Sequence, residues 1–141
     1  VESEIVGPEV ECGVLQYPDG RIVASAPALL HGTEEGDGGF YDFDTKYLDN
    51  VVTAEIPAPL EEDMTQLIQS LAVETFQALA CEGLARVDFF VTTNGPVLNE
   101  INTMPGFTPI SMYPQMFAAS GVDYEELLDT LVQQALHRGS N

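Results

Sequence analysis

Two neighbouring apolar stretches of the chain contain side chains that are typical metal ligands. Asp88 lies in the stretch 86–91, and Glu100 and Asn102 lie in the stretch 97–102. An Asn-Gly pair between the stretches predicts that they form the two strands of a hairpin. Burial of a carboxylate in a sheet costs free energy unless a cation or hydrogen bonds satisfy it. Two carboxylates and an amide oxygen are hard ligands, so the hairpin predicts a magnesium site.

The period of a β-strand tests whether these three side chains can meet. Glu100 and Asn102 are two residues apart, so they share a face of their strand. A two-residue loop at 94–95 would turn Asp88 to the other face, whereas a three-residue loop at 93–95 places Asp88 opposite Glu100. We therefore expect the three-residue loop, whose last residue is a glycine that can adopt the left-handed conformation needed there.

Spacing alone leaves an alternative open. Asp88 and Glu100 are equally well explained as solvent-facing residues on a half-exposed sheet. Arg86 falls on the same face, opposite Asn102, and its guanidinium could replace a metal as the cation between the two carboxylates, which otherwise repel each other. The opposite face also includes Asn99, for which the sequence offers no reason. The remaining residues of that face are expected to be core, and they are Val87, Phe89, Val91, Val97 and Ile101.

The composition limits the classes of function that the chain can have. It has 141 residues, 45% of them hydrophobic, which suffices for one domain with a core. The formal net charge is -19, from 23 acidic and 4 basic residues, so we exclude nucleic acid as a partner. No apolar run reaches the length of a membrane span, so no membrane contact is expected. If the chain binds a phosphate group, Lys46 or Arg86 must contribute, because Arg21 and Arg138 are the only other permanent cations.

Local patterns predict an α+β domain with a largely antiparallel sheet packed with helices. Alternation between turn signals predicts strands at 9–15, 21–26 and 51–56 in addition to the hairpin. Helical periodicity predicts helices at 61–80, at 114–119 and from Asp123, the expected N-cap, to near Arg138. The last helix is expected to bury Leu127, Leu128, Leu131, Val132, Ala135 and Leu136.

The segment 31–39 is rich in glycine and acidic residues and is interpreted either as a linker or as a mobile lid. Cys12 and Cys81 lie beside apolar residues, and we expect them to be core side chains in a reducing compartment. His31 and His137 lie in polar surroundings and are expected at the surface, so the sequence predicts no Cys/His metal site.

The hairpin and the segment after it resemble the C-terminal signature of the D-alanine–D-alanine ligases, within the ATP-grasp superfamily. The matching residues are Gly-Leu-Ala-Arg-Val-Asp at 83–88, Asn-Glu-Ile-Asn-Thr-Met-Pro-Gly-Phe-Thr at 99–108 and Ser-Met-Tyr-Pro at 111–114. The likeness extends from the first residue to about Arg138. It implies that 1–141 is a C-terminal ATP-grasp domain, with a hinge strand at 1–8 and a closing loop at 31–50. The N-terminal and central domains of the family are expected upstream of Val1.

The resemblance also implies an activity. Members join two D-alanines to D-alanyl-D-alanine for peptidoglycan, using ATP and an acyl-phosphate intermediate, in the bacterial cytoplasm and often as homodimers. Two Mg²⁺ ions, or Mn²⁺ in their place, accompany the ATP. The chain would supply the metal, ATP and second-substrate half of the site, so we expect the isolated chain to be inactive. The alternatives are another ATP-grasp carboxylate–amine ligase and a non-enzymatic acidic module that binds divalent cations.

Family roles carry over to single residues of the signature. Asp88, Glu100 and Asn102 would be the metal ligands, with Glu100 shared between both ions. Arg86 and the backbone of Gly106 would stabilise the tetrahedral intermediate.

Further roles are implied outside the metal ligands. Ser111 and the Met112 backbone would bind the carboxylate of the second D-alanine. The adenine contacts would come from Glu2, Ser3 and Ile5.

Three further residues complete the implied ATP site. Glu9 would bind the ribose hydroxyls. Lys46 would reach the terminal phosphate, and Tyr47 would lock the closing loop. The pattern Tyr-Asp-x-x-x-Lys-Tyr at 41–47 favours the dipeptide over a D-alanyl-D-lactate product.

Overall fold

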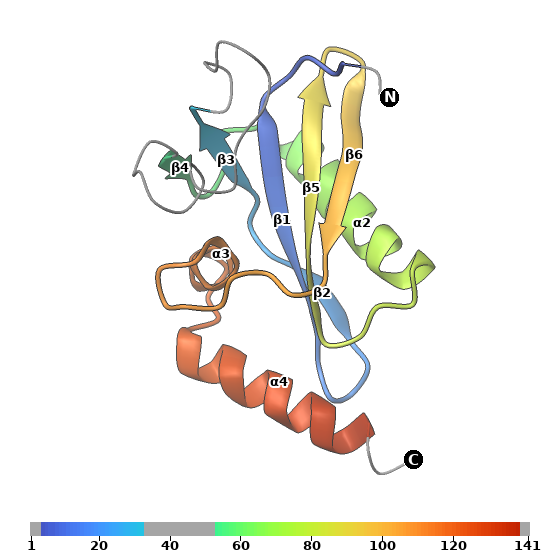
Figure 1. Ribbon diagram of the computed structural model, residues 1–141, viewed down its shortest axis with the longest axis vertical. Coiled ribbons are helices and arrows are strands. Elements are labelled where there is room, and N and C mark those ends of the chain that lie inside the picture. The colour runs from blue at the N-terminus through green and yellow to red at the C-terminus, as the bar shows by residue number, and fades with distance from the viewer. Residues whose placement is uncertain (1–3, 33–52, 139–141) are drawn as a thin grey trace.

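The computed structural model describes residues 4–32 and 53–138. Its strands are β1 (Glu9–Gln16), β2 (Ile22–Ala24), β3 (Ala28–His31), β4 (Thr53–Glu55), β5 (Leu84–Thr92) and β6 (Gly95–Asn102), and its helices are α2 (Glu62–Ala78), α3 (Met112–Ala119) and α4 (Tyr124–Arg138). The strands form one six-stranded sheet in the order β4-β3-β1-β5-β6, with β2 paired to β1 (Figure 1). Every pairing is antiparallel. The predicted α+β class is confirmed.

One face of the sheet is covered by α2 (Figure 1). The β1 residues that alternate onto this face are apolar and fully buried: Val10, Cys12 and Val14. Helix α2 meets them with the residues Ile68, Ala72 and Phe76, which recur every four positions and therefore lie on one side of the helix. The two-residue period of β1 and the four-residue spacing on α2 thus place these apolar side chains in one core between the sheet and the helix.

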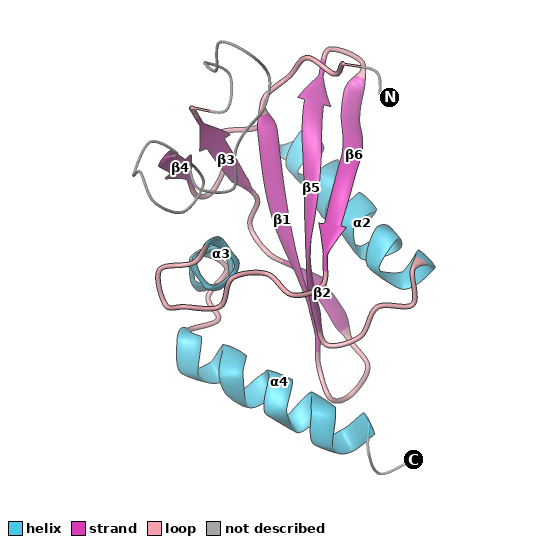
Figure 2. Ribbon diagram, in the orientation of Figure 1, coloured by secondary structure: helices cyan, strands magenta, loops and turns pink. Residues whose placement is uncertain are grey.

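The other face of β1 is divided between a core and a polar region. Leu15 packs with Tyr113 and Phe117 of α3 and with Leu127 of α4, and all four are buried. Figure 2 shows that α3 and α4 lie beside the lower half of the sheet, where β1 ends. Glu9 and Glu11 alternate onto the same face as Leu15 but lie nearer the start of β1. The charged part of this face therefore lies beyond the two helices.

The β5–β6 hairpin turns differently from the prediction. Thr92 pairs with Gly95, which leaves only Thr93 and Asn94 between the strands. The Thr92 hydroxyl stabilises this turn because it donates a hydrogen bond to the Gly95 carbonyl at 2.8 Å and accepts one from the Asn94 N–H at 3.1 Å. The predicted three-residue loop at 93–95 is therefore wrong.

A β-bulge nevertheless restores the predicted pairing of the charged residues. Asp88 pairs with Glu100 whereas Phe89 pairs with Leu98, so Asn99 is the extra residue on β6. This shift by one residue explains the position of Asn99. It also moves Val97 opposite Phe90, away from the α2 face, so the prediction that Val97 is core is wrong; its exposed fraction is 37%.

Three other expectations differ from the structure. Strand β3 was not predicted, because Ala28–His31 is short and lacks clear alternation. Residues 4–8 form no strand, so the described part of the expected hinge strand at 1–8 is not one. Of the closing loop expected at 31–50, His31 belongs to β3, and residues 33–50 lie outside the described residues.

Helix α4 buries less apolar surface than predicted. Leu127 is fully buried, but Leu128, Val132 and Leu136 are exposed by 40%, 55% and 62%. The described residues cover α4 from one side only, with Leu127 and Leu131 packed against the α3 cluster. The expected N-cap is confirmed, because the Glu126 N–H donates to Asp123 Oδ1 at 2.9 Å. No helix in 4–32 and 53–138 has the length and apolar composition needed to cross a membrane.

Gly13 allows α3 to approach β1 closely. A Cβ at this position would lie 2.8 Å from Phe117 Cε2 and 3.2 Å from Ser25 Oγ. Beside it, the buried Tyr113 hydroxyl donates to the Val14 carbonyl at 2.8 Å. A side chain at 13 would therefore push α3 away from the sheet.

We predict that Gly13→Ala lowers the free energy of unfolding by about 2 kcal/mol, because overpacking a close contact typically costs 1–3 kcal/mol. Urea unfolding followed by circular dichroism measures this change. The control is Gly20→Ala in the β1–β2 turn, where φ is +88° but no atom lies within 4 Å of the new Cβ. An effect of Gly13→Ala no larger than the backbone strain measured at Gly20 would contradict the prediction.

Cys12 is a buried thiol without exposed surface. Burial raises the pKa of Cys12 from its ordinary value of 9.0 to about 12, although hydrogen bonds with Ser25 act in the opposite direction. Between these pH values the unfolded chain loses the proton while the folded protein keeps it. We therefore expect the free energy of unfolding to fall as the pH rises from about 9, by at most about 1.4 kcal/mol per pH unit from this group.

Urea titrations at several alkaline pH values measure this slope, and Cys12→Ala should remove that contribution while leaving contributions from other groups. The same burial predicts that a thiol reagent modifies the partly exposed Cys81 before Cys12 in the folded protein. Equal rates for both thiols would show that Cys12 is accessible.

Candidate active site

The charged face of the sheet is centred on the guanidinium of Arg86. Its Nε and Nη2 donate hydrogen bonds to the two carboxylate oxygens of Asp88, at 2.8 and 2.7 Å. Glu11 Oε1 lies 3.4 Å from Nε, and Glu100 Oε1 lies 3.8 Å from Nη2. One cation is therefore shared by three carboxylates from three adjacent strands.

The members of this cluster differ in burial. Asp88 has no exposed surface, and the side chains of Glu11 and Arg86 are exposed by only 4% and 12%. Glu100 is exposed by 56%, so the cluster opens toward solvent at β6. A bidentate arginine–carboxylate pair is among the strongest hydrogen-bonded ion pairs, which accounts for a fully buried charge at Asp88.

Strand register brings the cluster together. Glu11 of β1 pairs with Asp88 of β5, and Asp88 pairs with Glu100 of β6. Directly paired residues on neighbouring strands point to the same face. Arg86 lies two residues before Asp88 and thus reaches it along the same face. The predicted meeting of Arg86, Asp88 and Glu100 is confirmed, and the cation between the two carboxylates in this structure is Arg86.

The environment of Arg86 keeps it charged. Burial alone favours the neutral form and lowers the pKa of Arg86. The hydrogen bonds to Asp88 and the charges of Glu11, Asp88 and Glu100 together outweigh burial and raise the pKa above its ordinary value. These hydrogen bonds and ion pairs involve Nε and Nη2 and hold the guanidinium among the three carboxylates.

Asn102 lies on the same face, paired with Arg86 and two residues from Glu100. Its Oδ1 accepts a hydrogen bond from the Met104 N–H at 2.9 Å, which fixes the side chain at the end of β6. An amide oxygen has a second lone pair that can still bind a cation. Asp88, Glu100 and Asn102 thus form an all-oxygen set on one face, which fits magnesium by donor chemistry.

Glu11 is a member of the cluster that the sequence prediction missed. Carboxylate oxygens of Glu9, Glu11 and Asp88 lie within 4.8 Å of one another, and all three residues are buried. The strand predicted at 9–15 already places Glu9 and Glu11 on one face, opposite to the apolar Val10 and Cys12. What could not be known from the sequence was that β5 is the neighbour of β1.

The loop between β6 and α3 brings the predicted substrate residues together. A Cβ on Gly106 would lie 3.1 Å from Ser111 Oγ, so the two positions are in contact. Ser111 Oγ accepts the Thr108 N–H at 3.0 Å, and Met112 is the first residue of α3. The first N–H groups of a helix have no acceptor within that helix and attract anions. The arrangement suits the binding of a carboxylate.

The remaining predicted site residues are only partly covered by the structure. Glu9 begins β1 and is exposed by 8%, within the acidic group of Glu11 and Asp88. Ile5 is described and is exposed by 38%. The others lie outside the described residues: Glu2, Ser3, Lys46 and Tyr47.

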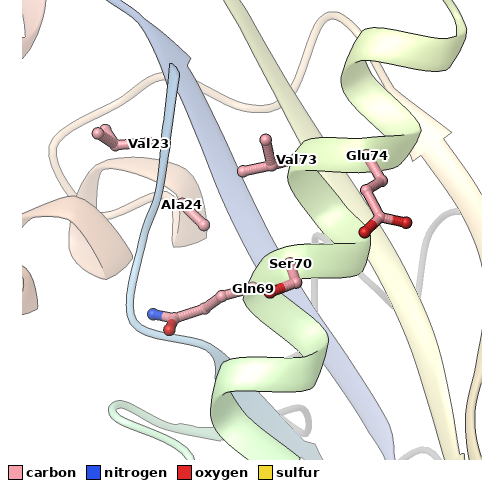
Figure 3. Close-up of a pocket in the computed structure, with 6 residues that line it drawn as sticks. All are labelled: Val23, Ala24, Gln69, Ser70, Val73 and Glu74. Atoms are coloured by element: carbon pink, nitrogen blue, oxygen red, sulfur yellow. The ribbon is translucent and has the colours of Figure 1, made fainter. Parts of the chain in front are cut away.

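A separate cavity of about 470 Å³ lies between β2 and α2 (Figure 3). The face of the sheet that α2 covers is opposite to that of Arg86. The Gln69 Nε2 already donates a hydrogen bond to the Ser25 carbonyl at 2.9 Å. The cavity contains none of the predicted site residues, and it is lined by Val23, Ala24, Gln69, Ser70, Val73 and Glu74.

The sheet topology and the oxygen-rich cluster define the C-terminal part of an ATP-grasp protein. The chain belongs to the family described as D-ala D-ala ligase C-terminus, whose model matches residues 1–133.

Named relatives agree with this family. A D-alanine–D-alanine ligase of Corynebacterium efficiens is 89% identical over 141 residues, which are 100% of this chain and 39% of that protein. The chain thus spans about two fifths of the length of the curated relatives it matches.

Two solved structures share the fold. The D-alanine–D-alanine ligase from Coxiella burnetii has a TM-score of 0.76 at 38% identity, covering 99% of this chain and 35% of that chain. The VanG D-Ala:D-Ser ligase from Enterococcus faecalis has a TM-score of 0.76 at 35% identity, covering 93% and 37%. The same fold thus occurs in ligases named for different second substrates.

We predict that Arg86→Gln lowers the free energy of unfolding by about 3–5 kcal/mol, because it leaves the charges of Asp88 and Glu11 buried without their cation. The matched control is Arg138→Gln. Arg138 pairs with Glu82 at 2.7 Å, but both side chains are exposed, by 68% and 45%, so a loss of at most about 1 kcal/mol is expected. Urea unfolding compares the variants, and equal losses would show that the buried cluster adds nothing to stability.

Proposed function

We propose that this chain is the C-terminal ATP-grasp domain, 1–141, of a cytoplasmic ligase that joins two D-alanines for peptidoglycan with hydrolysis of ATP to ADP. The N-terminal and central domains would complete the active site, and the complete ligase would be a homodimer. The family match and the 89% identity to a named D-alanine–D-alanine ligase support this activity. The observation that carries the proposal is the cluster of Arg86, Asp88 and Glu100, aligned with Asn102 on one face of the sheet.

In this proposal Asp88, Glu100 and Asn102 hold two Mg²⁺ ions, with Glu100 shared; Mn²⁺ could replace Mg²⁺. Bound there, the ions would neutralise charge on the phosphates of ATP during phosphoryl transfer. The exposed Glu100 is the accessible ligand, whereas Asp88 is reached only from within the cluster. Both Asp88 oxygens accept hydrogen bonds from Arg86. A bound ion would therefore share these oxygens with the guanidinium.

Arg86 would act on the reacting carboxyl group. Attack of the second D-alanine amine on the acyl phosphate forms a tetrahedral intermediate with a negative oxygen. A fixed cation near that oxygen stabilises the transition state more than the ground state, because the charge develops there. The charged guanidinium of Arg86, held by Asp88, is suited to this role, and the Gly106 N–H would be the second donor.

The second D-alanine would be held by its carboxylate. Ser111 and the Met112 N–H would bind this group at the start of α3, where the helix dipole favours a negative charge. The contact between Gly106 and the Ser111 hydroxyl supports a common site for both ends of this substrate. A side chain at Gly106 would displace that hydroxyl.

ATP would be bound by residues at the start of the chain and in the closing loop 31–50. Adenine would contact Glu2, Ser3 and Ile5 of the hinge 1–8, and Glu9 would bind the ribose. Lys46 would contact the terminal phosphate, and Tyr47 would hold the loop closed. These assignments follow from the resemblance of the sequence to the ligase family.

The experiment joins this chain to the remaining residues of the Corynebacterium efficiens relative, in place of that protein's matching segment. We predict that the joined protein forms D-alanyl-D-alanine and releases ADP and phosphate when given ATP, Mg²⁺ and D-alanine. Glu100→Gln and Asn102→Ala should each lower kcat by at least about a hundredfold, because they remove ligands of ions that stabilise charge in the transition state.

The control variant is Glu82→Gln, which removes one exposed carboxylate from the Arg138 ion pair and should leave turnover unchanged. Competition between D-serine and D-alanine as the second substrate measures specificity. A joined protein that folds and binds ATP but forms no dipeptide would refute the proposed ligation. Preferred incorporation of D-serine would refute the assignment of the second substrate.

A further inference from the structure

Glu11 differs from the other two acids around Arg86. Asp88 and Glu100 are proposed to bind magnesium, so their oxygens cannot serve Arg86 alone when the ions are present. Glu11 is absent from that ligand set, yet its Oε1 lies 3.4 Å from Arg86 Nε. It is thus the member of the cluster whose contact with Arg86 can persist when metal is bound.

The backbone of Glu11 is fixed from both sides. On one side it pairs with Ala28 of β3, and on the other with Asp88 of β5. A residue in the middle of a sheet cannot move its Cα without disturbing both neighbouring strands. The Glu11 side chain is also buried, with an exposed fraction of 4%. Its carboxylate is therefore well placed to fix a neighbouring group.

Arg86 needs such a fixed partner. Its side chain is long and flexible, and a cation that stabilises a developing charge must be held before the reaction begins. Asp88 is on the same strand as Arg86, two residues away, and the Asp88 oxygens are the ones that a metal would share. A carboxylate on another strand constrains the guanidinium independently of Asp88.

We propose that Glu11 is the positioning residue for Arg86, holding its guanidinium in place while Asp88 and Glu100 bind Mg²⁺. This inference rests on the proposed function, because it takes Asp88 and Glu100 to be metal ligands. Glu11 itself touches neither substrate nor metal in the proposal. Glu9 is less well placed for this role, because it pairs with Phe90 whereas Glu11 pairs with Asp88, so Glu9 lies two residues farther than Glu11 from the β1 position that pairs with Arg86.

The first test follows Arg86 directly and needs no turnover. Phenylglyoxal modifies accessible guanidinium groups, and mass spectrometry of the peptide that contains Arg86 gives the rate for this residue alone. It is measured in the joined protein with chelator and with Mg²⁺ plus ADP. We expect slow modification of unsubstituted protein in both conditions. In Glu11→Gln we expect slow modification with chelator and at least fivefold faster modification with Mg²⁺ and ADP.

Two other results would contradict the inference, one about the contact between Glu11 and Arg86 and one about its link to metal binding. If Glu11→Gln is modified as slowly as the unsubstituted protein when Mg²⁺ and ADP are present, Glu11 does not hold Arg86. If modification is equally fast with chelator, Glu11 holds Arg86 at all times and the link to metal binding is refuted. Glu82→Gln is the matched control, because it removes an acid from another arginine and should leave the rate at Arg86 unchanged.

The second test separates positioning from general destabilisation. We expect Glu11→Gln to lower kcat by about tenfold to a hundredfold, the usual effect of misplacing a catalytic group, with the KM for ATP changed by less than twofold. Glu11→Asp, which keeps the charge on a shorter side chain, should recover part of kcat. An unchanged kcat would refute the positioning role.

Loss of folding and loss of turnover are distinguished from loss of the contact between Glu11 and Arg86. If Glu11→Gln does not fold, as judged by circular dichroism, Glu11→Met replaces it as an uncharged side chain of similar volume. If the unsubstituted joined protein forms no dipeptide, the proposed function fails, whereas the labelling of Arg86 still decides whether Glu11 holds the guanidinium.

Discussion

The buried ion pair between Arg86 and Asp88 is the interaction on which the charged face depends. Asp88 has no exposed surface, and its neighbours Val87 and Phe89 are core residues of the α2 face. Without a cation, a charge at this position would be strongly destabilising. The pair therefore allows a single strand to serve the apolar core on one face and a polar cluster on the other.

The hairpin shows how far the sequence could predict this arrangement. The prediction that Asp88 and Glu100 share a face was correct. Side chains alternate between the two faces of a strand, so few registers place Asp88, Glu100 and Asn102 on the same face. The turn was predicted wrongly, because the hydrogen bonds of the Thr92 side chain stabilise a two-residue loop. Asn99 was the unrecognised signal: a polar residue on an expected core face marked the bulge that corrects the register.

The sequence could not predict which elements that are far apart in the chain become neighbours in the fold. Glu11 lies far from Asp88 in the chain, and only the strand order brings them together. Likewise, periodicity found the helix α4, but it could not show which side of the helix the described residues cover, so Leu128 and Val132 were wrongly assigned to the core. Local patterns define elements, whereas burial and site composition depend on which elements become neighbours.

The division of the site between sheet and loop bears on substrate choice. Ligases named for D-alanine and for D-serine as second substrate match this chain with the same TM-score of 0.76. The fold at this level therefore does not determine the acceptor. Arg86 and the acids would act on charges that both reactions share, and they sit on rigid strands. The two acceptors differ by one hydroxyl, so discrimination must come from side chains near the acceptor. Loops vary more readily than strands, so under the proposed function a substitution in the segment between Asn102 and Ser111 would alter the acceptor site with less disturbance of the charged face than a substitution in β5 or β6.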